Sequence, residues 1–219
     1  METKKIELPK GYLSFSAIQV WIANPERYKK LYFENDDMYG FSNAGMTYGS
    51  KVANALEHGL ETGDMMTDTA MELLPKYDIQ DKEIRATITT PEGSVDILGK
   101  PDSMDSKTKN FIEFKTGKVP WTQKKAEKTL QLKMYAVLIY LKYKVLLDKA
   151  TLVWMETFVD EDGETRPTGT IKSFEVKLTL IDLIDTMALI VKVAKEIEAE
   201  WLIYEKPKEE TLEEWRKNG

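Results

Sequence analysis

The sequence predicts an α/β protein in which a central mixed β-sheet is flanked by helices, with further helices at the N-terminus. The first reason is the order of its periodic segments, which runs helices, three strands, helix, two strands, helix. The second is composition, because 42% hydrophobic and 31% charged residues are typical of a globular protein. A length of 219 residues suits a single domain over residues 1–219.

Capping residues and turns delimit the individual elements. Ser14 and Ser16 can cap the first helix, and Pro25 can begin the second. The turn at residues 91–93, Pro-Glu-Gly, joins the first two strands as a hairpin. The predicted helices cover residues 16–24, 25–33, 49–61, 122–143 and 181–204. The predicted strands cover residues 83–90, 94–99, 110–116, 150–158 and 170–178, and residues 205–219 are expected to form an exposed acidic tail.

The residue types that the chain lacks restrict its metal chemistry. Without cysteine there can be no disulfide, no thiolate zinc site and no Cys-ligated iron–sulfur cluster. The single histidine, His58, excludes a site with several His ligands. A bound metal would therefore be a hard cation held by oxygen ligands, such as magnesium, manganese or calcium.

Charge is unevenly distributed along the chain. The net charge of −6 argues mildly against a passive nucleic-acid binder. Residues 34–83 hold eleven acids and three lysines, a net of −8, whereas residues 100–133 hold nine lysines and four acids, a net of +5. No apolar run reaches the roughly 18 residues of a membrane span. The N-terminal METKKIELPK lacks the apolar region of a signal peptide, so a cytoplasmic location is expected.

The stretch NFIEFKTG, residues 110–117, places charged side chains among apolar ones. In a strand, Ile112 and Phe114 face one way and Glu113 and Lys115 face the other, with the two charged residues about 7 Å apart along the strand. A charged pair on a half-buried strand is either a surface feature or a functional site. Carboxylate-x-Lys triplets recur elsewhere in the chain, so this strand alone does not decide between the two.

Asp102 raises the odds of a site. It follows Pro101 at the end of the preceding strand, and ten residues separate it from Glu113. A tight return of that length can bring the two carboxylates together, which would make half of an octahedral magnesium site. Lys115 would point into the same cleft, where its ammonium could orient or deprotonate a metal-bound water and stabilise charge on a phosphate. Phosphodiester hydrolysis needs this combination.

The motifs resemble the PD-(D/E)xK nuclease superfamily, in its RecB-type branch. The segments PD…EFK, followed by TGK, carry the catalytic pattern. LSFSAIQVWIANPERY is similar to the opening helix and the Cys-Pro-x-x-aromatic segment of that branch. Residues 49–57 are similar to its Gly-x-x-apolar-His-x-x-Leu-Glu helix, and Gln131-x-x-x-Tyr135 to its closing motif. Order and spacing match over about residues 12–140.

The resemblance implies a restriction-endonuclease-like core and a DNA nuclease that depends on Mg²⁺ or Mn²⁺. It favours an exonuclease over an endonuclease, leaving 5′-phosphates, in recombination or repair of cellular or phage DNA. Single- or double-stranded DNA ends are then the expected partner, and a homo-oligomer or a recombination-protein partner stays open. The alternative is a catalytically weak or inactive subunit that keeps the nuclease fold and binds DNA or a protein.

Roles of single residues follow from the same resemblance. Gln131 is expected to contact the active-site lysine or the DNA, and Tyr135 to lie near the phosphate path. Their i, i+4 spacing places them on one helix face, where a partly buried polar pair is the competing interpretation. The implied catalytic residues are Asp102, Glu113, Lys115, Gln131 and Tyr135. The implied metal ligands are Glu57, Asp102, Glu113 and the backbone carbonyl of Phe114.

Two positions depart from the family pattern. Ala53 stands where the family helix carries a metal-binding His, and Glu57, four residues on and on the same face, could supply the missing oxygen. His58, one position further round the helix, is interpreted as a surface or packing residue. Asn24 stands where iron–sulfur members carry a Cys. The chain is therefore expected to hold neither an iron–sulfur cluster nor zinc.

A possible DNA-binding surface follows the catalytic strand. Base stacking on Trp121, with phosphate contacts from Lys118 and Lys124, would hold a DNA strand there. Packing of Trp121 at the start of a helix explains the same residue at least as well.

Overall fold

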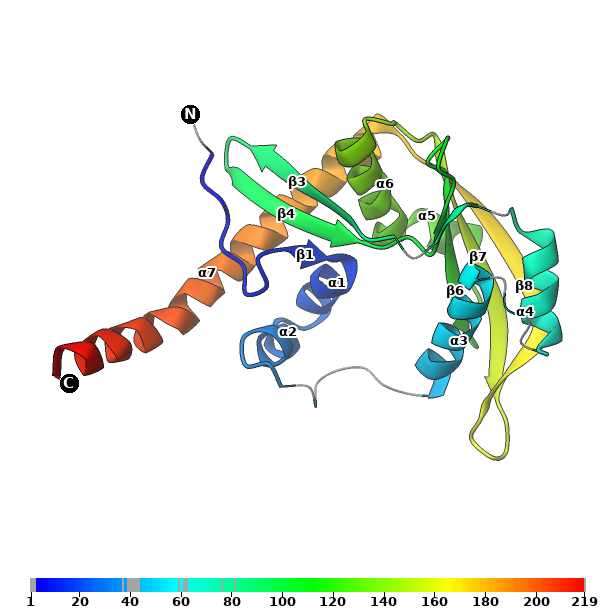
Figure 1. The fold of residues 1–219 in the computed structure, drawn as a ribbon, viewed down its shortest axis with the longest axis horizontal. Coiled ribbons are helices and arrows are strands. Elements are labelled where there is room, and N and C mark those ends of the chain that lie inside the picture. Colours follow the sequence, from blue (N-terminus) through cyan, green and yellow to red (C-terminus); the bar gives the residue numbers. More distant parts are fainter. Residues whose placement is uncertain are drawn as a thin grey trace. The chain divides into compact units, whose positions relative to one another are not determined.

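The computed structural model describes residues 3–36, 38, 44–58, 60, 63–75, 77–80 and 82–218, apart from the side chains of residues 44–47, 57, 73, 80 and 206–218. The chain forms two compact units, each of which combines helices with strands (Figure 1), so the predicted α/β class is confirmed. Unit 1 comprises Met1–Gly40, Arg85–Leu98 and Ile184–Gly219, and unit 2 comprises Phe41–Ile84 and Gly99–Leu183.

A three-stranded sheet organises unit 1. Its strand order is β1-β4-β3, where β1 is Leu13–Ser14, β4 is Gly93–Gly99 and β3 is Ile84–Thr90. β3 and β4 form the predicted hairpin, and β1 runs parallel to β4. Inward-facing residues alternate with outward-facing ones along both long strands, so one face of the hairpin is buried and the other is polar.

Helices α1 (Phe15–Ala23) and α2 (Pro25–Tyr32) follow β1 in unit 1. The Ser14 side chain accepts a hydrogen bond from Ala17 N and caps α1, whereas Asn24 caps α2, whose first residue is a proline. Aromatic side chains from α2 and from the long helix α7 (Leu180–Asn218) fill the core beside them. Phe33 meets the half-buried Trp201 of α7 with ring centroids 5.0 Å apart.

A five-stranded mixed sheet organises unit 2, in the order β2-β5-β6-β7-β8. Its strands are β2 (Ile79–Gln80), β5 (Ser103–Met104), β6 (Phe111–Gly117), β7 (Lys149–Val159) and β8 (Thr165–Lys177). β6 and β7 are parallel, and the other neighbouring pairs are antiparallel. β6 carries the charged pair, and its position inside the sheet lets both of its faces be covered.

Helices cover both faces of β6. On one face, α3 (Ala44–His58) and α4 (Met65–Leu73) close a hydrophobic cluster (Figure 1). That cluster contains Val52, Met66, Ala70, Ile112, Val153 and Met155, with Phe114 packed against it. On the other face, α6 (Leu130–Tyr143) packs the Tyr135 ring edge-on against Phe111. The predicted apolar face of this strand, which carries Ile112, is therefore buried under helices.

The helix predicted over residues 122–143 is wrong as a single element. It is divided into α5 (Gln123–Glu127) and α6, because Thr129 has extended backbone angles (φ −70°, ψ 124°). The break has a local signal in Thr122, whose side chain accepts a hydrogen bond from Lys125 N and caps α5. A second β-branched residue, Thr129, then precedes α6, so the chain restarts its helix with Gln131 facing the sheet.

Other differences concern short elements and element ends. The sequence prediction missed α4 and the strands β1, β2 and β5, since a strand of two residues shows no alternation. The helix predicted over residues 49–61 runs from Ala44 to His58. The helix predicted over residues 181–204 continues further, because the backbone of α7 runs through Asn218, and the exposure of residues 205–219 stays a prediction.

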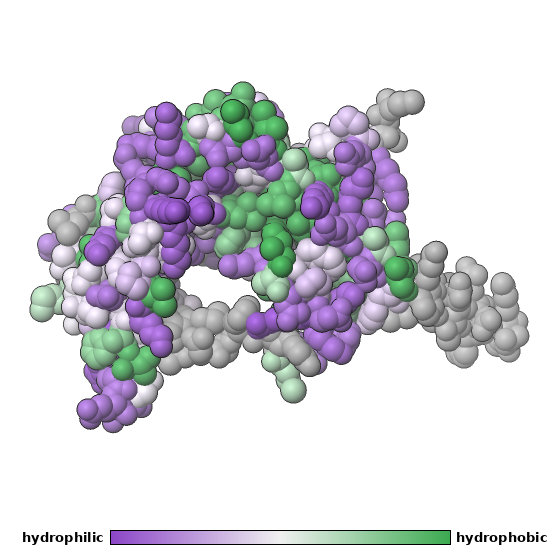
Figure 2. Space-filling view, turned by 180° about the vertical axis from the view of Figure 1, so that it is seen from behind, coloured by the Kyte–Doolittle hydropathy of each residue, from purple (hydrophilic) through white to green (hydrophobic). Residues whose placement is uncertain are grey.

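Polar residues predominate on one face of the protein. Figure 2 shows hydrophilic residues over much of one face, with hydrophobic patches between them. No helix in the described ranges is both long and apolar enough to cross a membrane.

Gly99 at the end of β4 offers a test of how α6 is packed. A Cβ at this position would lie 2.5 Å from Leu138 Cδ1 and 2.8 Å from Tyr135 Cε1, both on α6. Gly99→Ala should therefore lower the free energy of unfolding by about 1–3 kcal/mol, as overpacking does. Urea unfolding measures the change. In a Leu138→Ala background the added methyl should cost less. An unchanged urea midpoint for Gly99→Ala would show that α6 does not pack here as described.

Candidate active site

Strand register places the two candidate carboxylates side by side. β5 pairs with β6 through Ser103 opposite Ile112 and Met104 opposite Phe111. One residue further in the same antiparallel register, Asp102 comes opposite Glu113. Asp102 Oδ2 accepts a hydrogen bond from the backbone N–H of Phe114 at 2.6 Å. This contact holds the Asp102 carboxylate against the edge of β6.

β6 becomes an open edge beyond this point. β5 begins only at Ser103, so the backbone of β6 from Phe114 onward has no strand partner on that side in the described part of the chain. The N–H and C=O of one strand residue point toward the same side. Because the N–H of Phe114 faces Asp102, its carbonyl faces the same edge. Three of the four predicted ligand groups therefore lie at or beside this edge, whereas the fourth, the Glu57 side chain, lies outside the described residues.

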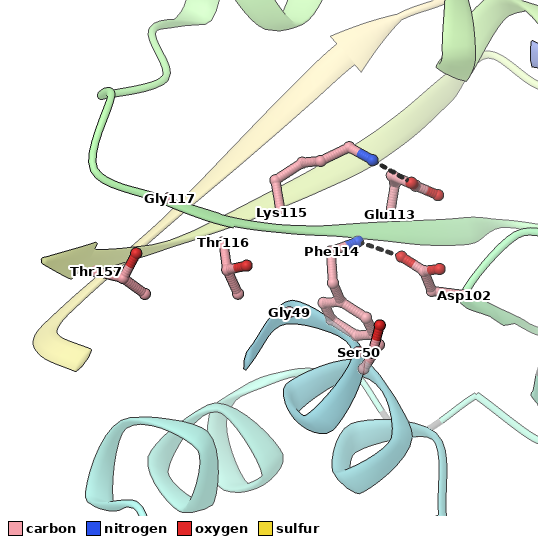
Figure 3. A pocket seen from close by; sticks show the side chains of 10 residues that line it. Gly49, Ser50, Asp102, Glu113, Phe114, Lys115, Thr116, Gly117 and Thr157 are labelled. Carbon is pink, nitrogen blue, oxygen red and sulfur yellow. Dashed lines mark hydrogen bonds and ion pairs between the residues drawn. The ribbon is translucent and has the colours of Figure 1, made fainter. Parts of the chain in front are cut away.

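The charged pair of β6 lies on the strand face opposite Phe114. Figure 3 shows Glu113 and Lys115 on one side of the ribbon and the Phe114 ring on the other, toward α3. Lys115 Nζ donates a hydrogen bond to Glu113 Oε1 at 2.6 Å. The Lys115 side chain is 29% exposed and that of Glu113 only 3%. The lysine thus connects a buried carboxylate to the solvent side of the site.

Helix α6 supplies a polar pair behind Glu113. Gln131 Nε2 donates hydrogen bonds to Glu113 Oε1 and to Tyr135 Oη, the latter at 3.1 Å. Both side chains are buried, and burial raises the pKa of the Tyr135 hydroxyl. The structure places Gln131 against the carboxylate rather than against Lys115. Tyr135 in turn lies behind Gln131, so the pair supports Glu113 from inside the protein.

The electrostatics of Glu113 favour the protonated form of its carboxyl in the metal-free protein. Burial raises the pKa of its carboxyl to about 8, and repulsion from Asp102 adds to the shift, while Lys115 and Gln131 oppose it. Burial also raises the pKa of Asp102. Glu113 Oε2 is buried and has no hydrogen-bond partner among the described residues. A buried carboxylate oxygen without a partner is costly unless a cation or proton meets it.

The donor set fits a hard divalent cation. The carboxylates of Asp102 and Glu113 and the Phe114 carbonyl are all oxygen ligands, which magnesium and manganese prefer. The unpartnered Oε2 supplies an acceptor that the protein itself leaves unused. Within the described side chains no group of three or more His, Cys, Asp or Glu residues gathers to hold a metal. Among the described residues, the protein would thus supply two carboxylates and one backbone carbonyl to such a site.

A cavity of about 470 Å³ adjoins these groups. Besides Asp102 and residues 113–117, it is lined by Gly49, Ser50, Ala53 and Thr157. A Cβ at position 49 would lie 2.8 Å from Thr116 Oγ1, so a glycine lets α3 approach β6 this closely. The small residues of α3 thereby form the second wall of the cavity.

Hydroxyl groups line the cavity beside the carboxylates, and sequence reasoning missed them. Ser50, Thr116 and Thr157 all face it (Figure 3). Thr157 is only 5% exposed, and its hydroxyl makes no hydrogen bond with a described residue. The alternation of β6 could have indicated Thr116, which shares the face of Phe114. Thr157 had no such signal, because a register shift between Met155 and Thr157 decides its direction.

The structure describes some, but not all, of the α3 side chains that the sequence singles out. Ala53 lines the cavity, so the methyl group stands where the resembled family carries an imidazole. The side chain of Glu57 lies outside the described part of the chain, and its role stays a prediction. His58 is exposed, with Nδ1 3.0 Å from the carbonyl oxygen of Asn54 in its own helix. The interpretation of His58 as a surface residue is confirmed.

The residues predicted to bind DNA lie outside the cavity lining. Lys118 and Lys124 are exposed, and Trp121 is half-buried between them in the chain. Lys125 Nζ lies 4.2 Å from the centroid of the Trp121 ring, which is a cation–π contact. Trp121 lies just before α5, and Lys125 lies within it. Trp121 is thus already engaged at the start of α5, and a stacking role stays a prediction.

The raised pKa of Glu113 implies a pH-dependent penalty in the metal-free protein. Its pKa rises from 4.5 to about 8 on folding, so the folded state binds more protons between these values. The contribution of this group to the free energy of unfolding is then fully present below the lower pKa, and it is lost as the pH rises through the upper one. Glu113→Gln should therefore be more stable than wild type near about pH 9 and similar near about pH 5. Urea unfolding in EDTA at both pH values measures this.

An exposed carboxylate serves as the control for that experiment. Glu161 lies in the exposed loop between β7 and β8, and Glu161→Gln should leave the pH dependence of unfolding as in wild type. Parallel pH profiles for Glu113→Gln and wild type would contradict the raised pKa of Glu113.

Solved structures of similar fold include two exonucleases. A phage-related exonuclease from Haemophilus somnus 129PT gives a TM-score of 0.46 at 12% identity, covering 86% of this chain and 82% of that one. An alkaline exonuclease from Laribacter hongkongensis gives a TM-score of 0.45 at 17% identity, covering 92% and 95%. No family model matches the chain, and no curated protein matches it in sequence.

Proposed function

We propose that the chain is a metal-dependent deoxyribonuclease of the PD-(D/E)xK type. One observation carries the proposal: a buried glutamate with an unpartnered oxygen lies beside Asp102 and Lys115 at the rim of one cavity. A plain structural module has no use for this arrangement, because burying two neighbouring carboxylates costs stability. The arrangement suits a site that gathers positive charge around a phosphodiester.

Asp102, Glu113 and the Phe114 carbonyl would hold Mg²⁺ or Mn²⁺, and Glu57 is proposed to complete the ligands in place of the missing imidazole. A cation bound there supplies Lewis-acid stabilisation of a phosphate and a more acidic water. Gln131 keeps the Glu113 carboxylate oriented through Oε1, which leaves Oε2 for the cation. Tyr135 fixes Gln131 in turn through its hydroxyl.

The remaining cavity residues act on the substrate in this proposal. Lys115 holds a cationic group at the solvent side of Glu113, where it stabilises charge that develops on the phosphate. The hydroxyls of Ser50, Thr116 and Thr157 line the same space and can donate hydrogen bonds to phosphate oxygens. The site thus offers metal ligands on one wall and neutral donors beside them.

The finer function rests on the sequence resemblance. An exonuclease acting on DNA ends, in recombination or repair of cellular or phage DNA, is the preferred form. Ala53 favours a second candidate, a weakened or inactive subunit that binds DNA or a protein, because it removes a ligand position from α3. Cleavage of linear and circular DNA, single- and double-stranded, with Mg²⁺, Mn²⁺ or EDTA distinguishes these candidates.

The carboxylates provide the first test of the nuclease proposal. Asp102→Asn and Glu113→Gln should each lower cleavage at least about 100-fold and weaken Mn²⁺ binding, since one remaining carboxylate leaves too little charge for the cation. Calorimetric titration with Mn²⁺ and cleavage of labelled DNA measure the two effects. Full activity in either variant would end the assignment. The same titration on Glu57→Ala decides whether Glu57 belongs to the site, because normal metal affinity would remove it.

Lys115 provides a second, independent test. An interaction made mainly in the transition state affects kcat more than ground-state binding. Lys115→Ala should keep metal and DNA binding but lose about 100-fold or more in single-turnover rate. Lys115→Arg should not restore the rate well, because a planar guanidinium does not replace a compact ammonium. A Lys115→Ala protein within a few-fold of wild type at saturating DNA would reduce this lysine to a structural partner of Glu113.

A further inference from the structure

Unit 1 contains two cavities that the nuclease chemistry does not use. Their volumes are about 450 and 290 Å³, and both are lined by Lys10 and Tyr12. The larger is further lined by charged and polar groups of the N-terminal segment and the β3–β4 hairpin, Lys5, Arg85, Thr87 and Asp96. The smaller is further lined by hydroxyl-bearing side chains of β1, α1 and α2, which are Ser14, Ser16, Tyr28 and Tyr32. The two cavities are therefore neighbours that share the walls formed by Lys10 and Tyr12.

The path of the N-terminal segment creates this space. The segment pairs with β4 at Lys5 opposite Ser94 and again at Leu13 opposite Ile97. Lys5 and Leu13 are eight positions apart, whereas their partners on β4 are only three apart, so the chain must leave the strand edge between them. It turns at Gly11, whose φ of +72° suits glycine. Lys10 and Tyr12 flank that turn and line the resulting space.

Positive charge dominates the larger cavity. Its lining holds three cationic side chains and one carboxylate, a net of +2 in a chain of net charge −6. The carboxylate of Asp96 is already bound by Lys5 Nζ at 2.7 Å and by Thr87 Oγ1 at 2.6 Å. These contacts lower the pKa of Asp96, so it stays ionised and paired. An anion entering the space meets Lys10, and Arg85 adds positive charge to the same lining.

Aromatic rings lie directly beside these cations. Lys10 Nζ is 4.6 Å from the centroid of the Tyr32 ring, and Arg85 Cζ is 5.2 Å from that of Tyr12. The exposed Lys10 and Arg85 are thereby held over half-buried rings at the cavity wall. A ligand that combines an anion with a flat aromatic group matches this lining. A nucleotide has that combination.

We propose that this cavity pair binds a segment of single-stranded DNA, separately from the cleavage site. Single-stranded DNA exposes base faces for Tyr12 while its phosphates meet Lys10 and Arg85, whereas a duplex hides its bases in the stack. The proposal rests on the proposed function in taking DNA as the ligand. It also gives a use to the LSFS segment, which catalysis does not need: Ser14 and Ser16 both line the smaller cavity.

Binding without hydrolysis tests the proposal. Anisotropy of a labelled oligodeoxythymidine of about 12 nucleotides is measured in EDTA over a series of salt concentrations. Lys10→Ala should weaken binding roughly ten-fold and reduce the slope of log K against log salt by about 0.7, the value for one lost phosphate contact on a single strand. Tyr12→Ser should weaken binding roughly ten-fold, while Tyr12→Phe, which keeps the ring, should bind as wild type.

Lys192→Ala is the matched control, because this lysine of α7 also lies in unit 1 and its side chain is 73% exposed. Affinity and slope should stay unchanged in it. Wild-type binding by Lys10→Ala, or an equal loss in Lys192→Ala, would overturn the proposal. Thymidine monophosphate that competes as strongly as the oligonucleotide would overturn it in favour of a free nucleotide. If Tyr12→Ser fails to fold, Lys10→Ala alone decides.

Cleavage assays keep this test distinct from that of the proposed function. A protein that cuts DNA with Mg²⁺ but binds it independently of Lys10 would disprove the second site alone. A protein that binds the oligonucleotide through Lys10 and never cuts DNA would disprove the nuclease alone.

Discussion

The burial of the Glu113 carboxylate beside Asp102 is the constraint on which the architecture of unit 2 depends. A carboxylate can be this deeply buried only in a strand covered on both faces, and β6 has α6 on one face and α3 with α4 on the other. If apolar groups alone covered the face of β6 that carries Glu113, the Glu113 carboxylate would have no hydrogen-bond donors. Gln131 and Lys115 therefore meet one of its oxygens, while the other has no hydrogen-bond partner among the described residues.

An early strand end is as important as the burial. If β5 continued past Asp102, ladder hydrogen bonds would occupy the edge of β6 where the Phe114 carbonyl faces outward. Instead β5 is two residues long, and a side chain takes over the last donor, the Phe114 N–H. The small residues of α3 then keep the space beside this edge open. Pairing and its interruption both contribute to the site.

The parts of this site that depend on strand parity could be predicted from the sequence. The ten-residue return determines that Asp102 meets Glu113, and alternation determines that Glu113 and Lys115 share a face. The break at Thr129, the partner of Gln131 and the direction of Thr157 could not be predicted in this way. They depend on how α6 and β7 pack in three dimensions, which local periodicity does not encode. The same limit hid the division of the strands into two sheets.

The unpartnered oxygen of Glu113 has a consequence for how such a chain changes over generations. Folding gains nothing from a charge at this position, and a neutral side chain of the same shape would keep the contacts of Gln131 and Lys115. Most proteins stand only slightly above the stability that they need, so mutations that relieve a buried charge are tolerated as soon as the charge has no task. A copy of this chain released from its reaction would therefore lose Glu113 early. The proposed reaction would thus account for a charge that folding stability alone does not explain.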